Sequence, residues 1–424
     1  MWRPVLILAF CLMAGIAAAS PLDDAEQAIL QCRAVDAIAT VEAFRPATRT
    51  QTLRRLWILG VANNRAGRPR DAVAPLARLV AQVPGNPVFR LELATALIRS
   101  NQTERARYHL ELVQGANLPP ALRTRVQSEL DRLAKPRPWQ GYLRFALIPE
   151  SNAARRTAAD SLNFGGLVFG IDPNARAKPA NGVELGFGLA ALPRLGESLR
   201  GRIGADLQAR VFDGNAPDDV TLRLGAALLH FGDGGRQLSF ELYASQRWLD
   251  NRKYALTKGV VLGYTRTLGP KARVSASLLR ENIDYSTGGF TLARSALSVR
   301  LAYVARPQLV LRIGARVEDR SSRGGNLAGQ AAGLTIGGDY AFAGGLRFGL
   351  DLSYDRNAFD GLHPLFGVER IDNKVSAAMQ LTNQNWNYMG FAPVLKLGLE
   401  RQRSSIVVNS YSNLSASIGM TRSF

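Results

Sequence analysis

The sequence predicts a multidomain α + β chain, a helical solenoid followed by a transmembrane antiparallel β-barrel. Three observations support this. The chain begins with a secretory leader, apolar residues then recur at spacings of three and four through residues 21–135, and a period of two takes over beyond residue 138. We therefore predict a signal peptide over 1–19, a helical domain over 20–135 and a barrel over 136–424.

The leader reads MWRPVLILAFCLMAGIAAAS, in which Arg3 precedes an apolar run and small residues precede a cleavage site after Ala19. The run is shorter than the roughly 20 residues that a membrane-spanning helix needs. The bulky Phe10 before Cys11 fits a lipoprotein signal poorly. The leader thus indicates an exported protein with a removable signal peptide.

Charge, cysteine content and the length of apolar segments limit which partners and which kind of membrane insertion the sequence allows. The net charge of +19 is compatible with nucleic acid or an anionic membrane, but the basic residues are scattered and the chain is exported, so no nucleic-acid partner is expected. Without the signal only Cys32 remains, which excludes an intramolecular disulfide and is expected to be a small buried residue. No later segment has 18 consecutive apolar residues, so any membrane insertion must be as a barrel.

A 34-residue offset relates two stretches of the helical part. It pairs small or large apolar residues at Gly60 and Ala94, Ala72 and Ala106, and Leu76 and Leu110. These positions look like the packing sites of two tetratricopeptide repeats, with capping helices near 22–43 and 120–134. Such a stack presents a concave groove for a peptide or protein, and we place a client groove around Asn63, Asn64 and Arg99.

The strands of the second part alternate clearly, for example over 202–212, 220–228, 309–318 and 346–355. At about ten to thirteen residues they are longer than ordinary sandwich strands and suit a tilted crossing of a bilayer. The apolar face would meet lipid and the polar face a hydrated lumen. The predicted lumen residues are Arg202, Asp206, Arg210, Arg223, Glu241, Arg312, Arg316, Arg347 and Asp351.

The connections between the predicted strands indicate how many strands the barrel has. Short connections alternate with longer or more polar ones, the pattern of periplasmic turns and outer loops; the short ones are 193–198, 232–235, 268–271, 305–307 and 343–345. Because both barrel ends should lie in the periplasm, the number must be even. We predict 14 strands, the first over 138–150 and the last near 412–424, with 151–180 as an outer loop that can fold inward. The terminal aromatic residue, Phe424, is predicted to be the end recognised by the barrel-assembly machinery.

The sequence contains little that resembles a catalytic, metal-binding or nucleotide-binding motif. A hydrolase could use His363 beside Asp360 with Ser321 or Ser322, but the sequence lacks a G-x-S-x-G elbow. It also lacks zinc-ligand spacing and a phosphate-binding P-loop. We therefore predict no catalytic, cofactor-binding or metal-binding residues.

Two local stretches carry a family resemblance. IPESN (148–152) follows the first strand, with Glu150 where aspartate is more usual, and GFAPVLKLGLERQRSSI (390–406) places Pro393 inside the penultimate strand before a serine-rich loop. With the two-part plan, they make the chain similar to the surface lipoprotein assembly modifier (Slam) family.

The resemblance implies a translocator that delivers client proteins, surface lipoproteins or secreted soluble proteins, across the Gram-negative outer membrane, with the helical domain in the periplasm. It implies a client protein as partner. Together with the terminal strand and the barrel itself, this makes the expected partners a client, the barrel-assembly machinery and outer-membrane lipid, with a monomeric barrel and no cofactor. Two alternatives stay open. A tetratricopeptide-barrel exporter of polysaccharide shares the plan but tends to have more repeats, and a passive pore leaves the helical domain unexplained.

Overall fold

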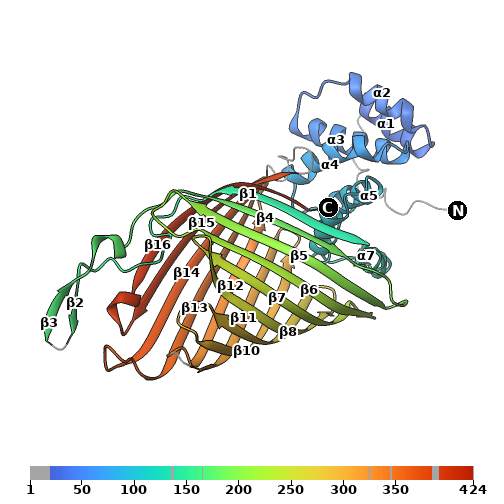
Figure 1. The fold of residues 1–424 in the computed structure, drawn as a ribbon. Coiled ribbons are helices and arrows are strands. Elements are labelled where there is room, and N and C mark those ends of the chain that lie inside the picture. Colours follow the sequence, from blue (N-terminus) through green and yellow to red (C-terminus); the bar gives the residue numbers. More distant parts are fainter. Residues whose placement is uncertain are drawn as a thin grey trace. The chain divides into compact units, whose positions relative to one another are not determined.

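The computed structural model describes residues 20–134, 138–164, 166–323, 326–343, 346–383 and 391–423. The chain forms two compact units. One comprises the residues up to Val80 together with Val88–Ala106, and the other comprises Ala81–Pro87 together with the chain from Arg107 onward. Figure 1 shows the helical elements and the barrel. The predicted signal peptide lies outside the described residues.

The described part of the N-terminal half contains seven helices: α1 (Pro21–Leu30), α2 (Ala34–Ala43), α3 (Arg49–Arg65), α4 (Pro69–Gln82), α5 (Pro87–Arg99), α6 (Thr103–Val113) and α7 (Pro120–Ala134). Local signals set their ends. The Thr48 hydroxyl accepts from the backbone N–H of Gln51, and the Gln51 side chain accepts from the backbone N–H of Thr48, which caps α3. Gly67, with φ of 74°, lets the chain reverse into α4.

The predicted repeat pattern is confirmed by the packing. Gly60 of α3 approaches Leu76 of α4 so closely that an added Cβ would overlap the leucine side chain. Leu76 and its counterpart Leu110 are both almost fully buried. The small residues of the pattern thus let the two helices of a repeat approach each other.

The expectation of a buried Cys32 is wrong. The residue is exposed, and its φ of 60° turns the chain between α1 and α2. The single capping helix expected over 22–43 is therefore two helices.

Fourteen antiparallel strands close into a barrel in the order β1-β16-β15 and so on down to β4, as predicted. Their bounds are β1 (Trp139–Leu147), β4 (Gly182–Ala191), β5 (Leu199–Phe212), β6 (Asp219–Gly232), β7 (Arg236–Leu249), β8 (Arg252–Leu268), β9 (Ala272–Tyr285), β10 (Thr291–Arg306), β11 (Leu309–Arg323), β12 (Gly329–Ala341), β13 (Leu346–Leu362), β14 (Glu369–Asn383), β15 (Ala392–Ser404) and β16 (Tyr411–Ser423).

The side-chain period gives the wall two different faces. In β13, Leu352 and Tyr354 are exposed on the outer face, at 42% and 44%, while Asp351 and Asp355 on either side of them point inward. A large exposed apolar surface of this kind is suited to a hydrocarbon solvent. Of the helices in the described part of the chain, none has the length and apolar character needed to span a membrane.

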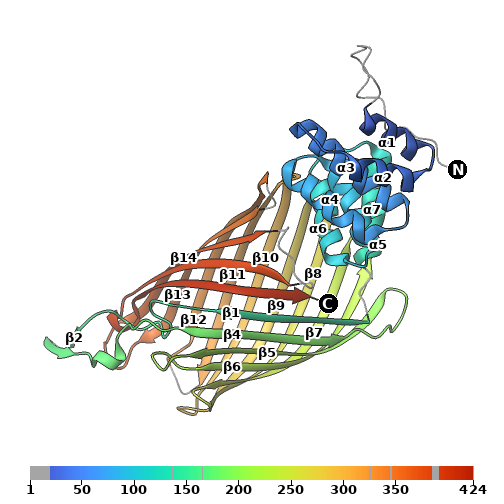
Figure 2. The same ribbon diagram turned by 90° about the horizontal axis from the view of Figure 1, so that it is seen from above.

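The predicted outer loop over 151–180 has two parts. Its first residues fold inward against the barrel wall, where the backbone N–H of Ser151 donates to Leu414 O at 2.8 Å. Its middle forms a separate hairpin, β2 (Ser161–Phe164) with β3 (Leu167–Gly170), which projects beyond the outer end of the barrel, the end that carries the longer loops (Figures 1 and 2).

Within the second unit, the end of α6 contacts the other end of the barrel. Glu111 forms an ion pair with Arg273 at 3.1 Å, and the Arg347 guanidinium lies over the Tyr108 ring at 4.6 Å. Gly115 packs so closely against the turn between β10 and β11 that a Cβ there would lie 2.7 Å from Val304. Residues after Arg107 thus continue directly into the barrel's structural unit.

Candidate functional site

The inner face of β5–β7 carries a first ion-pair network. Arg223 contacts Glu241 at 2.8 Å and lies 3.7 Å from the centre of the Tyr243 ring. Arg202 stands 3.9 Å from both Glu241 and Asp206. Four of the residues predicted for the lumen therefore meet in one cluster.

A second network lies across β11–β13. Arg312 binds Asp351 at 3.0 Å and also pairs with Asp339, which Arg347 approaches at 3.4 Å. The register explains the meeting, because Arg312 lies opposite Gly337 and Gly337 lies opposite Asp351. Asp339 completes this network and was not among the predicted residues.

A third network links β9, β10 and β11. Arg294 contacts Glu281 at 2.5 Å and Glu318 at 3.7 Å, and Arg316 also pairs with Glu318. Both glutamates are buried, so each needs a cationic partner to remain charged. Of these four residues, Arg316 is one of the predicted lumen residues, and Glu318 lies on the same alternating polar face of 309–318. Glu281 and Arg294 lie outside the strands whose alternation is clearest in the sequence.

The closing seam of the barrel, between β1 and β16, has a short ladder. Within the described residues, β1 pairs with β4 over Trp139–Leu147 and with β16 over Tyr142–Leu147, and an isolated bridge between Glu150 and Ser415 continues the second pairing at the outer end. On its other side, β16 pairs with β15 over most of its length, and Pro393 of β15 has no N–H for that ladder. In the described part of the chain, the β1–β16 ladder is shorter than the β1–β4 and β15–β16 ladders.

A buried polar cluster closes the outer end of the seam. The Glu150 carboxylate, 2% exposed, accepts from the Asn413 amide at 2.8 Å and pairs with Arg155 at 3.4 Å and with Arg210. Asn413 in turn accepts from the backbone N–H of Asn152 at 2.9 Å. We call Glu150, Asn152, Arg155, Arg210 and Asn413 the seam cluster.

The seam cluster ties distant strands together. Arg155 also binds Glu400 of β15 at 2.9 Å, while Arg210 belongs to β5. The IPESN stretch therefore supplies the residues that join both sides of the seam. The sequence pointed to Arg210 and to the IPESN stretch but not to Asn413. The one sequence feature that could have indicated Asn413 is its place as a polar residue on the inner face of the last strand.

The three residues predicted for a client groove all lie within the helical packing. Asn63 and Asn64 are buried; Asn63 donates to Leu59 O at 2.9 Å, and Asn64 donates to the Glu92 carboxylate at 2.8 Å. Arg99 donates to Asn64 O at 2.7 Å. Their geometry orients neighbouring helices, and contact with a client stays a prediction.

The other candidates are placed as follows. Phe424 lies outside the described residues. His363 Nδ1 accepts from the backbone N–H of Leu365 at 3.3 Å, and its ring packs 5.0 Å from Phe366. Among the described residues, no group of three or more His, Cys, Asp or Glu side chains is arranged to hold a metal ion.

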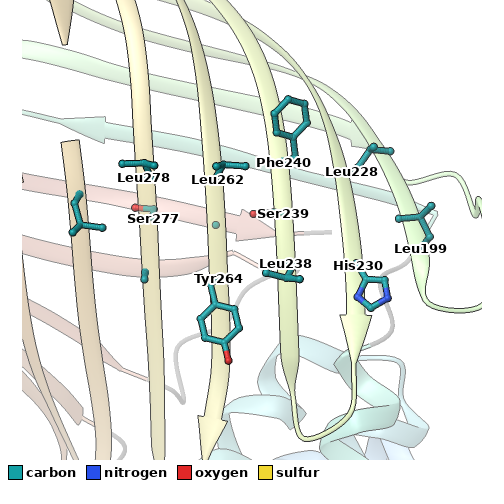
Figure 3. A pocket seen from close by; sticks show the side chains of 13 residues that line it. Leu199, Leu228, His230, Leu238, Ser239, Phe240, Leu262, Tyr264, Ser277 and Leu278 are labelled. Carbon is teal, nitrogen blue, oxygen red and sulfur yellow. The ribbon is translucent and has the colours of Figure 1, made fainter. Parts of the chain in front are cut away.

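An apolar depression of about 520 Å³ lies against β6–β9 (Figure 3). Leu228, Phe240, Leu262 and Leu278 line it in one cross-strand row, with His230 and Tyr264 toward one edge. All four row residues are exposed on the outer face. This surface suits lipid chains rather than a reaction.

Fold and lumen together define an outer-membrane β-barrel preceded by tetratricopeptide helices. The model of the tetratricopeptide repeat matches residues 64–123. The model of the surface lipoprotein assembly modifier matches residues 139–424, more than half of the chain. The chain belongs to the surface lipoprotein assembly modifier family.

Relatives agree with this assignment. Surface lipoprotein assembly modifier 1 of Neisseria meningitidis serogroup B is 23% identical over 387 residues, which cover 87% of this chain and 75% of the relative. A surface lipoprotein assembly modifier of Moraxella catarrhalis is 23% identical over 84% of this chain and 70% of the relative. Among solved structures, the outer membrane channel DcaP of Acinetobacter baumannii aligns with a TM-score of 0.41 at 10% identity, covering 68% of this chain and 96% of that one.

Proposed function

We propose that this protein delivers client proteins across the outer membrane, either lipoproteins to the cell surface or soluble proteins to the medium. The observation that carries the proposal is the family match along the whole barrel, joined to a helical repeat region that a simple pore does not need. The repeat region lies in the periplasm in this account and receives the client.

The lumen supplies a polar path. Its arginines are held by carboxylates on neighbouring strands, for example Arg223 by Glu241 and Arg312 by Asp351. A polypeptide that crosses a membrane needs partners for its backbone N–H and C=O groups, which water and these side chains provide. Ion pairs across strands can exchange partners with a passing chain without leaving a charge unpaired.

The seam supplies a place where the wall can open. Opening would expose the edges of β1 and β16, and such edges pair readily with an incoming strand. Within the described residues, the β1–β16 ladder begins at Tyr142, opposite Ser423, at the end away from the seam cluster. We propose that the seam opens from this end, with the seam cluster as the fixed point.

The role requires no catalysis, since delivery rests on binding and on strand exchange. Recognition of Phe424 by the barrel-assembly machinery, lateral contact with outer-membrane lipid, and action as a single barrel belong to the same proposal.

The test compares the surface and culture-medium proteomes of cells with and without the gene. We expect one or a few proteins to disappear from the surface or medium and to accumulate in the periplasm. If both proteomes are unchanged while surface polysaccharide is lost, the protein is an exporter of polysaccharide and this proposal is wrong. A change in small-solute uptake alone would identify a passive pore.

A further inference from the structure

The outer face of the barrel changes character near its outer end. Along β13 the outward side chains Leu350, Leu352 and Tyr354 are followed by Arg356, and along β15 Leu399 is followed by Arg401 and then Arg403. Leu399 is 52% exposed, as suits a residue that faces acyl chains. The arginines therefore begin where the apolar band ends, on the side of the outer loops.

Strand register gathers these arginines into one patch. Arg356 lies opposite Asn373, and Asn373 lies opposite Arg403, so the three share one cross-strand row. Arg401 occupies the next row, opposite Val375. Because adjacent strands are about 4.8 Å apart, Arg356 and Arg403 stand roughly 10 Å from each other. We call Arg356, Arg401 and Arg403 the arginine patch.

The arginine patch differs from the arginines of the lumen. All three side chains are exposed, and no carboxylate in the described part of the chain lies within ion-pair distance of them. Between them, Asn373 Oδ1 accepts from the Tyr354 hydroxyl at 2.8 Å, which leaves the side-chain amide NH2 of Asn373 as a further donor.

Outward-facing acids lie farther away. Asp319 belongs to β11, two strands from Arg356, and Glu369 lies four residues before Asn373 along β14. Within the described residues, three guanidinium groups without an ion-pair partner and an amide donor thus lie on the outward face, just beyond the apolar band. Guanidinium groups bind phosphate oxygens through paired, charge-assisted hydrogen bonds.

We propose that the arginine patch binds the phosphate groups of the outer-leaflet glycolipid, with the acyl chains of the same lipid on the apolar surface below. The position selects this ligand over inner-leaflet phospholipid, because the patch lies at the outer-loop end of β13 and β15. Basic residues at a membrane surface attract anionic headgroups in this way. β15 is next to β16, so the bound lipid lies on one flank of the seam. The proposal does not depend on the function proposed above.

Binding is measured on the purified full-length protein in detergent by native mass spectrometry, with bisphosphorylated lipid A as the probe. Arg356→Gln, Arg401→Gln and Arg403→Gln are made singly and together. The control is Arg266→Gln. Arg266 also lies on the outward face, but it is on β8 beside the short turn to β9, at the opposite end of the barrel from the arginine patch. We expect each single change to weaken binding about fivefold and the triple change on the order of a hundredfold, with the control unchanged.

Three comparisons separate the sources of affinity. Monophosphorylated lipid A should bind more weakly than the bisphosphorylated form, and phosphatidylglycerol or inorganic phosphate more weakly still. The triple change to lysine keeps the charges but loses the paired guanidinium hydrogen bonds, so it should bind more weakly than wild type and more tightly than the triple glutamine variant. If the triple glutamine variant does not fold, the three single variants supply the test. Equal binding by wild type and single or triple glutamine variants overturns the proposal, as does an equal loss in Arg266→Gln.

Discussion

Glu150 shows how one buried charge can hold a seam together. Its carboxylate is almost fully buried, yet the Asn413 amide and the Arg155 and Arg210 guanidiniums surround it. A buried ion contributes little by itself, because its desolvation offsets the attraction, but removing one partner is costly. The residue therefore fixes which strands meet rather than adding much net stability.

Replacing Glu150 with glutamine should lower the free energy of unfolding by about 3 kcal/mol, the low end for a broken buried pair because the guanidinium partners keep some contact with water. The measurement is the midpoint of urea unfolding in detergent micelles. Glu369→Gln, an exposed change of the same kind, is the control and should leave the midpoint unchanged. Equal midpoints for the Glu150 variant and wild type would refute the structural role of the seam cluster.

The helical unit has a pH-sensitive contact. Hydrogen bonding from Arg54, helped by the backbone N–H of Ser20, lowers the pKa of Asp23. Since the folded-state pKa lies below the unfolded value of about 3.9, the stabilisation is present above that value and is lost as the pH falls through the folded-state pKa.

Amide hydrogen exchange tests this contact. The protection factors of α1 should fall between pH 6 and pH 3 in wild type, and Arg54→Gln should show lower protection at pH 6 and a smaller fall. A variant with the same pH dependence as wild type would show that another group is responsible.

At the scale of elements, close packing of helices depends on single small residues. An added methyl at Gly60 would overlap Leu76, and overpacking typically costs about 1–3 kcal/mol. We expect Gly60→Ala to reduce the amide protection of α3 and α4. Combining it with Leu76→Ala should recover part of the loss, since the second change makes space; a double variant less protected than the sum of the singles would contradict the packing account.

The seam is the element whose opening the proposed route needs. Phe145 and Met420 lie directly opposite each other on the outer face, nearer the end of the seam that is proposed to open, so cysteines there are placed to cross-link β1 to β16. In a chain with Cys32→Ser, the oxidised pair should block client delivery and a reductant should restore it. The matched control joins positions 205 and 224 of β5 and β6, where Ala205 opposes Leu224. Normal client delivery by the oxidised seam variant would contradict opening of the seam and would mean that the client crosses through the lumen of a closed barrel.

At the scale of the whole molecule, the alternating pattern sufficed to predict the strand number, the topology and the inner face. It could not predict which charges meet. The two-residue period assigns each side chain to one face of the wall, but ion pairs also depend on how neighbouring strands are aligned. Arg312 and Asp351, for example, lie on strands separated by β12 and meet because of the register of both ladders. The Glu150–Asn413 contact joins residues 263 positions apart, and only barrel closure brings them together.

The two-part plan predicts a division of labour. Deleting residues 20–135 behind the signal removes the contacts of α6 with the barrel, but it should leave a barrel that inserts in the outer membrane, since the described barrel strands close on one another. Client delivery should be lost, because the repeats that are proposed to receive the client are gone. Surface levels of the client, measured beside heat-modifiable migration of the barrel, check both halves of this prediction. Full delivery by the barrel alone would remove the helical unit from the mechanism.

The most direct test of protein transport through this barrel is a photo-crosslink inside it. A photoreactive residue replaces Arg300, which faces inward on β10, and in a second strain it replaces Leu278, which is exposed on the outer face of β9. The account predicts that position 300 captures the same proteins whose export depends on the gene, while position 278 does not. Continued export with no exported protein captured at position 300 would contradict passage through the lumen.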